Sequence, residues 1–352
     1  MNDAGDSLIF LVSQPRSGST LLQNMLRGHP RIHTVPEPWL MLHLLYGQRP
    51  DGIAAEYDAG TAQRALLNYL SATGGGRQLH VASIRAAALR LYEGALEHSG
   101  KDLFLDKTPR YYLVAEELRE VFPMARLIFL VRNPLAVFSS MLESLAGDWT
   151  ALRRLDRMHD LVTAPRNIAR AASTLGGRIS VVRYEDLVHD AGRTLSRMLK
   201  DVAIEGTPDL TKYSALESVL GDTKSVTRHR SPVDDYVDQW KHNISSSESG
   251  ALASSYLDEL GEELVEQLGY SYRELADQLR TSSGGRKAET RWRMLLTSDD
   301  ELRWWHRMKL SFVHSAHQRG IWKTILRATY IAILGHAPLS RDARDHIDQR
   351  PV

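Results

Sequence analysis

LIFLVSQPRSGSTLLQNML, residues 8–26, is the stretch of this sequence that decides the fold. The apolar run of residues 8–12 stops abruptly, a turn of small and basic residues follows, and the apolar spacing then becomes that of a helix. A buried strand, a tight turn and a helix in this order form a loop that binds phosphate groups through the unpaired amides of the helix N-terminus. The density of Ser, Thr, Gly and Arg in one turn favours this anion-binding role over an ordinary strand-to-helix connection.

The turn differs from the loop of nucleotide hydrolases, whose pattern is GxxxxGK followed by Ser or Thr. Ser13 replaces the first glycine of that pattern and Ser19 replaces its lysine, while the second glycine and the hydroxyl are retained. The lysine that would reach the β- and γ-phosphates is therefore missing, and the cation lies earlier in the turn, at Arg16. The residues that we expect to bind an anion are Arg16, Ser17, Gly18, Ser19 and Thr20.

A second polar cluster, VRNPLAVFSSM at residues 131–141, begins at the end of another apolar run. A nucleotide hydrolase would carry an acidic residue at the end of that strand, whereas this strand ends in Arg132 and Asn133. Ser140 lies eight positions after Arg132, about two helical turns if a helix begins at Pro134. A guanidinium group and a hydroxyl at one strand edge suit a second phosphate. If this cluster stood alone, an ordinary surface arginine and an ordinary helix serine would be the better interpretation. Because it occurs together with the first loop, we favour the phosphate site.

Composition limits the kinds of protein to which this loop can belong. The 352 residues, 43% of them hydrophobic, suffice for one large α/β domain with a sizeable core, and the formal net charge of +1 argues against a general nucleic-acid binder. The absence of cysteine excludes disulfides, zinc–cysteine sites and thiol nucleophiles. The first residues are acidic where a secretory signal would be basic, and no stretch approaches the ~20 apolar residues of a membrane span. We therefore expect a soluble cytoplasmic protein.

Short apolar runs alternate with longer amphipathic ones, as expected for parallel strands with crossover helices. The runs predicted as buried strands are residues 8–12, 127–131 and 179–183, and those predicted as helices are residues 62–70 and 83–98. The expected fold is of the α/β class, with a central, mainly parallel sheet flanked by helices in three layers. The main domain is expected to span residues 1–281, and a Ser/Gly linker separates it from a helical extension at residues 286–352.

Three segments together carry a resemblance to a known family. PRSGSTLL at residues 15–22 resembles the 5′-phosphosulfate loop of sulfotransferases that use 3′-phosphoadenosine 5′-phosphosulfate (PAPS), and RNPLAVFSS at residues 132–140 resembles their 3′-phosphate motif. VRYEDLV at residues 182–188 resembles their third-strand signature, which implies that Tyr184 lies near the adenine. The resemblance covers roughly residues 8–270. It implies a P-loop-like fold, PAPS as sulfonate donor, adenosine 3′,5′-bisphosphate (PAP) as product, a hydroxyl-bearing acceptor, and no metal ion.

The same resemblance implies the catalytic residues. DKTPRYY at residues 106–112 is similar to the segment of cytosolic sulfotransferases that contains a catalytic histidine, but it has no histidine. Arg16, where the cytosolic enzymes have lysine, resembles the form found in tyrosylprotein and some bacterial sulfotransferases, whose base is a glutamate shortly after the first helix. Glu37 is the matching residue. It would accept the acceptor's proton, while Arg16 and Lys107 would stabilise charge on the transferred sulfonate and the departing phosphate.

Each of these assignments has an alternative. Without the resemblance, Glu37 is better explained as a solvated loop carboxylate, whereas as a base it would be desolvated by Trp39. Lys107 is equally well explained by a salt bridge to Asp106. The rival functions are a P-loop kinase, which the missing lysine and strand-end acid oppose, and a nucleotide-binding protein without catalysis.

Three further regions carry expectations. In the basic stretch after residue 221, Lys224 or Arg228 would contact the 3′-phosphate, against the alternative of a solvated charged face. Helices over residues 38–100 would cover the acceptor site, since substrate choice in the family lies in variable insertions. Residues 286–352 contain 13 Lys and Arg against 7 Asp and Glu, and four of the seven tryptophans. The open interpretations of this extension are helices packed on the body, a homodimer arm, a lid over an apolar acceptor and a membrane-surface element.

Overall fold

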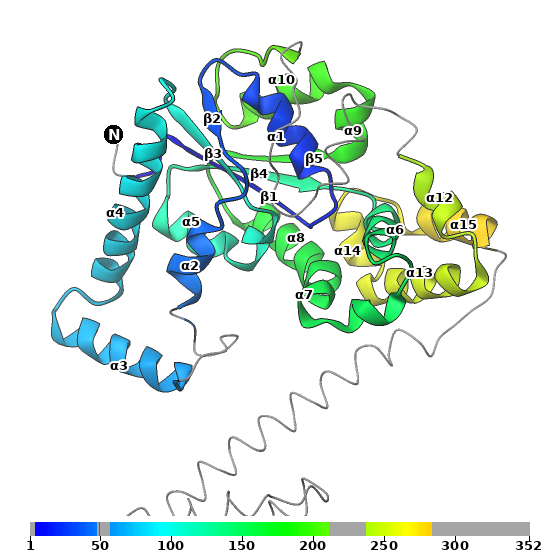
Figure 1. The fold of residues 1–352 in the computed structure, drawn as a ribbon, viewed down its shortest axis with the longest axis horizontal. Coiled ribbons are helices and arrows are strands. Elements are labelled where there is room, and N and C mark those ends of the chain that lie inside the picture. Colours follow the sequence, from blue (N-terminus) through cyan, green and yellow to red (C-terminus); the bar gives the residue numbers. More distant parts are fainter. Residues whose placement is uncertain (1–3, 48, 50–56, 211–236, 284–352) are drawn as a thin grey trace, which may run out of the picture. The chain divides into compact units, whose positions relative to one another are not determined.

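The structure is a computed structural model that describes residues 4–47, 49, 57–210 and 237–283. Its strands are β1 Leu8–Ser13, β2 Ile32–Thr34, β3 Leu103–Lys107, β4 Arg126–Val131 and β5 Ile179–Arg183. They form one sheet in the order β2-β3-β1-β4-β5, with every neighbouring pair parallel (Figure 1). Because the strands are parallel, the loops that follow them meet at one edge of the sheet, where ligands bind in open α/β sheets.

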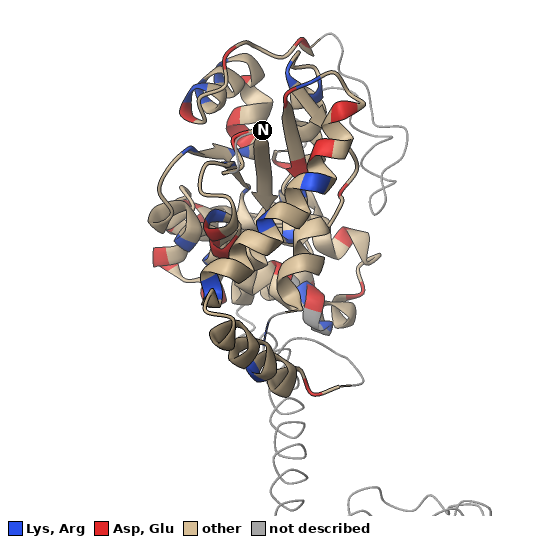
Figure 2. Ribbon diagram, turned by 90° about the vertical axis from the view of Figure 1, so that its left-hand side faces the viewer, with Lys and Arg blue, Asp and Glu red and all other residues tan. Residues whose placement is uncertain are grey.

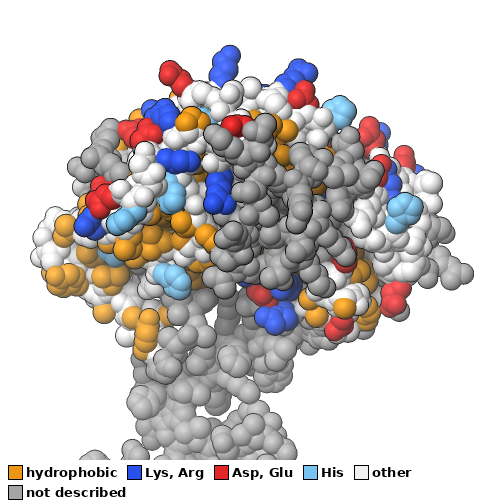
Figure 3. Space-filling view, turned by 45° about the horizontal axis from the view of Figure 1, so that its top comes forward, with side chains coloured by type: hydrophobic (Ala, Val, Ile, Leu, Met, Phe, Trp, Pro, Cys, Tyr) orange, Lys and Arg blue, Asp and Glu red, His pale blue; other side chains and the backbone are white. Residues whose placement is uncertain are grey.

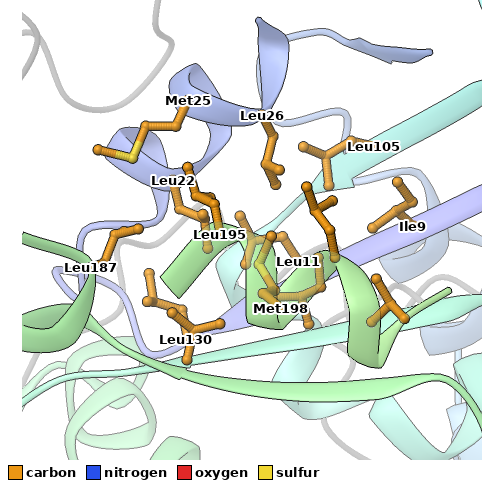
Figure 4. Close-up of a cluster of buried hydrophobic side chains, with 14 of the residues drawn as sticks. Ile9, Leu11, Leu22, Met25, Leu26, Leu105, Leu130, Leu187, Leu195 and Met198 are labelled. Carbon is orange, nitrogen blue, oxygen red and sulfur yellow. The ribbon is translucent and has the colours of Figure 1, made fainter. Parts of the chain in front are cut away.

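Three helices cover one face of the sheet: α1 Ser19–Arg27, α9 Tyr184–His189 and α10 Ala191–Asp201 (Figure 1). Alternate residues of a strand point to opposite faces, and Ile9 and Leu11 of β1 point to these helices. Their side chains form a buried cluster with Leu22, Met25 and Met198 (Figure 4). This packing fixes α1, and with it the loop that precedes α1, against the sheet.

The opposite face of the sheet carries α4 Gly76–Glu97, α5 Ala115–Val121 and α8 Ala164–Thr174 (Figure 1). Phe10 of β1 points to this side and packs edge-on against Tyr92 of α4 and Tyr111 of the 3-10 helix Pro109–Leu113. Both tyrosines are buried, so their hydroxyls need polar partners inside the protein. The predicted three-layer α/β arrangement is confirmed.

Further helices complete the described part of the fold. They are α2 Leu40–Tyr46, α3 Ala59–Ala72, α6 Pro134–Ser144, α7 Leu155–Met158, α12 Gln239–Asn243, α13 Ser247–Leu260, α14 Glu262–Gln267 and α15 Tyr272–Ser283, with a 3-10 helix Trp149–Arg153 and a π-helix His159–Thr163. None of the described helices is long and apolar enough to cross a membrane.

The three predicted strands are present within one residue of their predicted ends, and the two predicted helices overlap α3 and α4. The strands β2 and β3 were missed. β2 has only three residues, and β3 ends in two charged residues, Asp106 and Lys107, although all five of its residues are buried. Lys224, Arg228 and the extension at residues 286–352 lie outside the described residues.

Candidate active site

The loop between β1 and α1 turns through two residues in the left-handed region. Arg16 has φ 75° and Gly18 has φ 90°, and the N–H of Ser17 donates to the carbonyl of Gln14 at 3.2 Å. A β-carbon at Gly18 would lie 2.5 Å from two ring carbons of Tyr184. Glycine is therefore required at this position by the backbone and by the close approach of the tyrosine ring.

The first turn of α1, directly after this loop, has backbone amides that are free to donate hydrogen bonds. Gly18 precedes the helix and no side chain caps it, so the amides of the first turn have no partner within the helix. The Ser17 hydroxyl is buried and has no hydrogen-bond partner among the described residues. Backbone amides, an unpartnered hydroxyl and the positive end of the helix dipole fit an anionic group such as a phosphate or sulfonate.

The end of β4 brings the second predicted phosphate contact to the same loop. Arg132 Nη1 donates to the carbonyl of Arg16 at 3.0 Å, and Arg16 Nε donates to Ser140 Oγ at 3.2 Å. The Arg132 guanidinium lies over the ring of Tyr184, 4.3 Å from its centroid. Arg16, Arg132, Ser140 and Tyr184, which are far apart in the sequence, thus lie together, and the Tyr184 ring lies close to both Gly18 and Arg132.

Glu185, the neighbour of Tyr184, holds the start of α6. Its Oε1 accepts from the N–H of Asn133 at 2.9 Å, and its Oε2 accepts from the hydroxyl of Tyr270 at 2.7 Å. The Asn133 side chain in turn caps α6 by accepting from the N–H of Leu135 at 2.9 Å. Sequence reasoning missed Glu185, although the acid in YEDL is the signal that could have found it.

Glu37, which follows β2, forms an ion pair with Lys107, the last residue of β3. Lys107 Nζ lies 2.6 Å from Glu37 Oε1 and donates to Thr20 Oγ1 of α1 at 3.4 Å. The Lys107 side chain is 1% exposed and that of Glu37 is 18% exposed, so the carboxylate remains accessible while the cation is buried. The partner of Lys107 is Glu37 rather than Asp106, because consecutive residues of β3 point to opposite faces of the sheet.

Trp39 binds the other oxygen of the same carboxylate. Its indole Nε1 donates to Glu37 Oε2 at 3.2 Å, and its backbone, with φ 55°, stands at the N-cap of α2. The sequence predicts that Trp39 desolvates this carboxylate, and the structure adds a hydrogen bond from its indole. Lys107 and Trp39 each bind one oxygen of Glu37, and together they fix the orientation of the carboxylate.

Gln23 ties the segment that leads to Glu37 to α1. Its Nε2 donates to Thr34 Oγ1 and to the carbonyl of Val35, each at 2.8 Å. Thr34 Oγ1 donates to the carbonyl of Leu105 in β3 at 2.8 Å. The helix that begins at the anion loop therefore also positions the segment with the carboxylate.

A buried aspartate anchors the cation next to Trp39. The Arg110 guanidinium lies 5.5 Å from the centroid of the Trp39 ring, and its Nε and Nη2 donate to the two oxygens of Asp160 at 2.9 and 2.7 Å. Asp160, in the π-helix His159–Thr163, is 0% exposed and also accepts from the hydroxyl of Tyr112 at 2.9 Å. Sequence reasoning missed both Arg110 and Asp160, because no local spacing marks their pairing.

The predicted residues thus form two neighbouring groups, joined where Lys107 contacts Thr20. The first group lies at the anion loop and consists of Arg16, Ser17, Gly18, Arg132, Ser140 and Tyr184. The second group lies at the first turn of α1 and consists of Ser19, Thr20, Glu37 and Lys107. An accessible carboxylate next to a cationic anion-binding loop can take a proton from an acceptor while an anionic group is held beside it.

Comparison with known proteins identifies the family. The model of the sulfotransferase family matches residues 8–209, which is more than half of the chain. The chain belongs to the sulfotransferase family. Sulfonate transfer is the activity of such enzymes, and membership favours it over the kinase and the non-catalytic protein considered from the sequence.

The chain is also similar to individual proteins. Nodulation protein NoeE of Sinorhizobium fredii (strain NBRC 101917 / NGR234) is 30% identical over 289 residues; the match covers 75% of this chain and 66% of the relative, just under two thirds of its length. The sulfotransferase domain from the curacin biosynthetic pathway aligns with a TM-score of 0.50 at 23% identity, over 75% of this chain and 97% of that domain. The sulfotransferase domain of the Synechococcus PCC 7002 olefin synthase aligns with a TM-score of 0.44 at 29% identity, over 66% of this chain and 86% of that domain. The curacin-pathway domain supports the predicted P-loop-like fold.

Proposed function

We propose that this sulfotransferase transfers the sulfonate group of PAPS to a hydroxyl group of its acceptor, with Glu37 as the general base. The observation that carries the proposal is the position of Lys107, whose Nζ lies 2.6 Å from Glu37 Oε1 and 3.4 Å from Thr20 Oγ1. One buried cation joins a carboxylate to the first turn of the helix that follows the anion loop. Transfer of an anionic group to a hydroxyl requires this combination of base and positive charge.

In the proposed reaction Glu37 takes the proton of the acceptor hydroxyl while the acceptor oxygen bonds to sulfur. The bond between sulfur and the 5′-phosphate oxygen breaks, and its electron pair leaves with the phosphate, so that PAP is the second product. Arg16, Lys107 and the N-terminus of α1 stabilise the negative charge that grows on the phosphate side. The proposal assigns no step to a metal ion, because these groups supply the positive charge.

For the donor we propose two phosphate sites. Residues 16–20 bind the 5′-phosphosulfate, Arg132 and Ser140 bind the 3′-phosphate, and Tyr184 lies near the adenine. The proposal is supported by the hydrogen bonds that join Arg132 and Ser140 to Arg16, at 3.0 and 3.2 Å. It is also supported by the family motifs that these residues match.

On the acceptor side we propose that the helices of residues 38–100 cover the site. α2 begins directly after Trp39, and α3 carries a single charged residue, Arg64 (Figure 2). Five of the eight exposed large hydrophobic side chains of the described residues lie in this segment or at its edge: Tyr57, Leu67, Tyr69, Leu79 and Leu91. Hydrophobic side chains gather on the left of the face in Figure 3, the side on which Figure 1 has α3 and α4. These features favour an acceptor with an apolar part.

Glu37→Gln tests the proposed reaction, measured by calorimetric titration with PAP and by transfer of label from PAPS into fractionated cell extract. We expect the variant to keep its affinity for PAP within about 3-fold and to lose transfer by about 100-fold or more, the usual contribution of a general base. Glu97→Gln, the same substitution at an exposed position of α4, is the control and leaves both measurements unchanged. A protein without affinity for PAP overturns the donor assignment, and undiminished transfer by Glu37→Gln overturns the base.

A further inference from the structure

A buried carboxylate that the proposed chemistry does not use lies one residue before Lys107. Asp106 is 1% exposed and accepts from three hydroxyls: Tyr92 at 2.6 Å and Tyr111 at 2.8 Å on Oδ2, and Thr108 at 2.9 Å on Oδ1. Burial raises the pKa of this carboxyl to about 6, so at neutral pH it is ionised. An ionised carboxylate can only accept hydrogen bonds, and each of the three hydroxyls must donate to it.

Two of these hydroxyls connect Asp106 to the backbone at the start of α2. Thr108 Oγ1 accepts from the N–H of Trp39 at 3.3 Å, and the Tyr111 hydroxyl accepts from the N–H of Met41 at 3.0 Å. Each hydroxyl has one hydrogen, which it gives to Asp106, so its oxygen presents a lone pair to the amide. The carboxylate therefore fixes the direction of both hydrogen-bonded relays.

The first relay holds the residue that contacts the proposed base. Trp39 has φ 55° and ψ 10°, a left-handed conformation that a bulky residue keeps only where surrounding contacts determine it. Its indole donates to Glu37 Oε2 at 3.2 Å. The relays to Trp39 and Met41 lie on either side of Leu40, so they set the direction in which the indole reaches Glu37.

We propose that Asp106 is a positioning residue for Glu37 and acts from the face of β3 opposite to Lys107. Lys107 binds the Glu37 carboxylate directly, whereas Asp106 acts through two hydroxyls and the first turn of α2. The inference rests on the proposed role of Glu37 as the base. It gives a function to a carboxylate that lies wholly in the protein interior.

Tyr111→Phe and Tyr92→Phe are a matched pair that tests this role. Both substitutions remove a hydroxyl that donates to Oδ2 of Asp106 from a buried ring, but only the Tyr111 hydroxyl also accepts from the backbone of α2. We expect Tyr111→Phe to speed hydrogen–deuterium exchange in the peptide of residues 39–45 and to slow label transfer from saturating PAPS about 10-fold. The KM for PAPS stays unchanged. Tyr92→Phe changes exchange in this peptide and the transfer rate by less than about 2-fold.

Thr108 supplies a second, independent pair of variants. Thr108→Val removes the relay to Trp39 at nearly constant volume, and Thr108→Ser keeps the hydroxyl. We expect Val to reproduce the faster exchange and slower transfer, and Ser to restore both measurements to within about 2-fold of the wild type. This pair keeps the test decisive if Tyr111→Phe does not fold.

The possible results separate this inference from the proposed function. Equal exchange in the peptide of residues 39–45 for Tyr111→Phe and Tyr92→Phe overturns the relay, and faster exchange without slower transfer overturns the positioning role. Neither result affects the assignment of Glu37 as the base, which the Glu37→Gln variant tests separately. If Glu37→Gln transfers sulfonate at the wild-type rate, the proposed function fails, and with it the role of Asp106 in catalysis, while the exchange data still report whether Asp106 holds α2.

Discussion

Two loops meet at the candidate active site, and they are held in different ways. The loop after β1 takes its backbone course mainly from its own residues, through the left-handed conformations of Arg16 and Gly18 and a hydrogen bond within the turn. The segment after β2 depends on other elements: Gln23 of α1 binds its beginning, and Lys107 of β3 binds Glu37. The first loop is shaped mainly by its own backbone, with Arg132 and Ser140 bound to Arg16 from outside it, whereas the second is held by other elements.

This difference determines what each loop tolerates. A loop shaped by backbone geometry needs a particular residue at a particular position, as Gly18 shows by its φ of 90° and its contact with Tyr184. A segment held by side chains from other elements needs those partners, wherever they lie in the chain. The first loop should therefore fail after changes inside it, and the second after changes far from it.

The largest effect is expected from Gly18→Ala, which breaks the first loop from within. The added β-carbon would lie 2.5 Å from the ring of Tyr184, and the residue would have to keep a φ of 90°. Because the tyrosine is buried and cannot move aside freely, the loop must change its shape. We expect the affinity for PAP, measured by calorimetric titration, to fall by about 100-fold or more, or about 3 kcal/mol.

Gly94→Ala is the matched control for that variant. Gly94 lies inside α4, and a β-carbon there would meet nothing within 4 Å. The same substitution should stabilise the helix by up to about 1 kcal/mol and leave PAP binding unchanged. Wild-type affinity in Gly18→Ala would contradict a loop shaped by its own backbone.

An intermediate effect is expected from Arg110→Met, which disturbs the second loop from a distance. The substitution removes the cation over the Trp39 ring and takes the bidentate partner from Asp160, which is 0% exposed. Breaking a buried ion pair costs about 3 kcal/mol. We expect the midpoint of thermal unfolding to fall by about 6–12 °C. Sulfonate transfer should fall as well, while the affinity for PAP stays close to that of the wild type.

Arg77→Met provides the comparison at an exposed ion pair. Arg77 and Glu120 have side chains that are 72% and 38% exposed, so their loss should cost less than about 1 kcal/mol. If Arg110→Met weakened PAP binding as strongly as transfer, the two loops would not be held independently.

The strands of the sheet show how much of the fold the sequence could predict. β1, β4 and β5 were predicted because each contains a run of apolar residues. β3, with the sequence LFLDK, does not look like a buried strand, since a charged pair at its end is costly to bury without partners. The partners exist but come from other elements: three hydroxyls for Asp106, and Glu37 and Thr20 for Lys107.

The site residues divide in the same way. Arg16, Arg132 and Ser140 were predicted from motifs, and the structure brings them together. Asp160 was not predicted, because its partner Arg110 lies 50 positions away and its π-helix has no sequence pattern that we could recognise. Residues that act on a bound group leave a local pattern, whereas residues that hold other residues are visible only in the folded chain.

The smallest effect concerns pH, at the carboxylate that supports the second loop. Burial raises the pKa of Asp106 from 3.8 to about 6, so between these values the folded protein holds a proton that the unfolded chain has released. The titration of Asp106 therefore lowers the free energy of unfolding as the pH rises from about 4 to about 6, and it causes no further change above about pH 6. The groups that face the carboxyl are the hydroxyls of Tyr92, Tyr111 and Thr108, and the negative charge of Glu37 adds to the effect.

Asp106→Asn removes this titration and should change the slope of stability against pH. In urea unfolding, the variant should lose less stability than the wild type as the pH rises from 4 to 6, and the difference between the two should change by about 2 kcal/mol over this range. Asp102→Asn, directly before β3, is a control of opposite sign, because the hydrogen bond from Arg31 lowers the pKa of Asp102. Its wild-type carboxylate adds a small stability above about pH 4 that is lost as the pH falls, reduced by exposure to solvent. Parallel curves for Asp106→Asn and the wild type would mean that burial does not raise the pKa of Asp106. The support of the second loop would then have to come from the hydroxyls of Tyr111 and Thr108 alone.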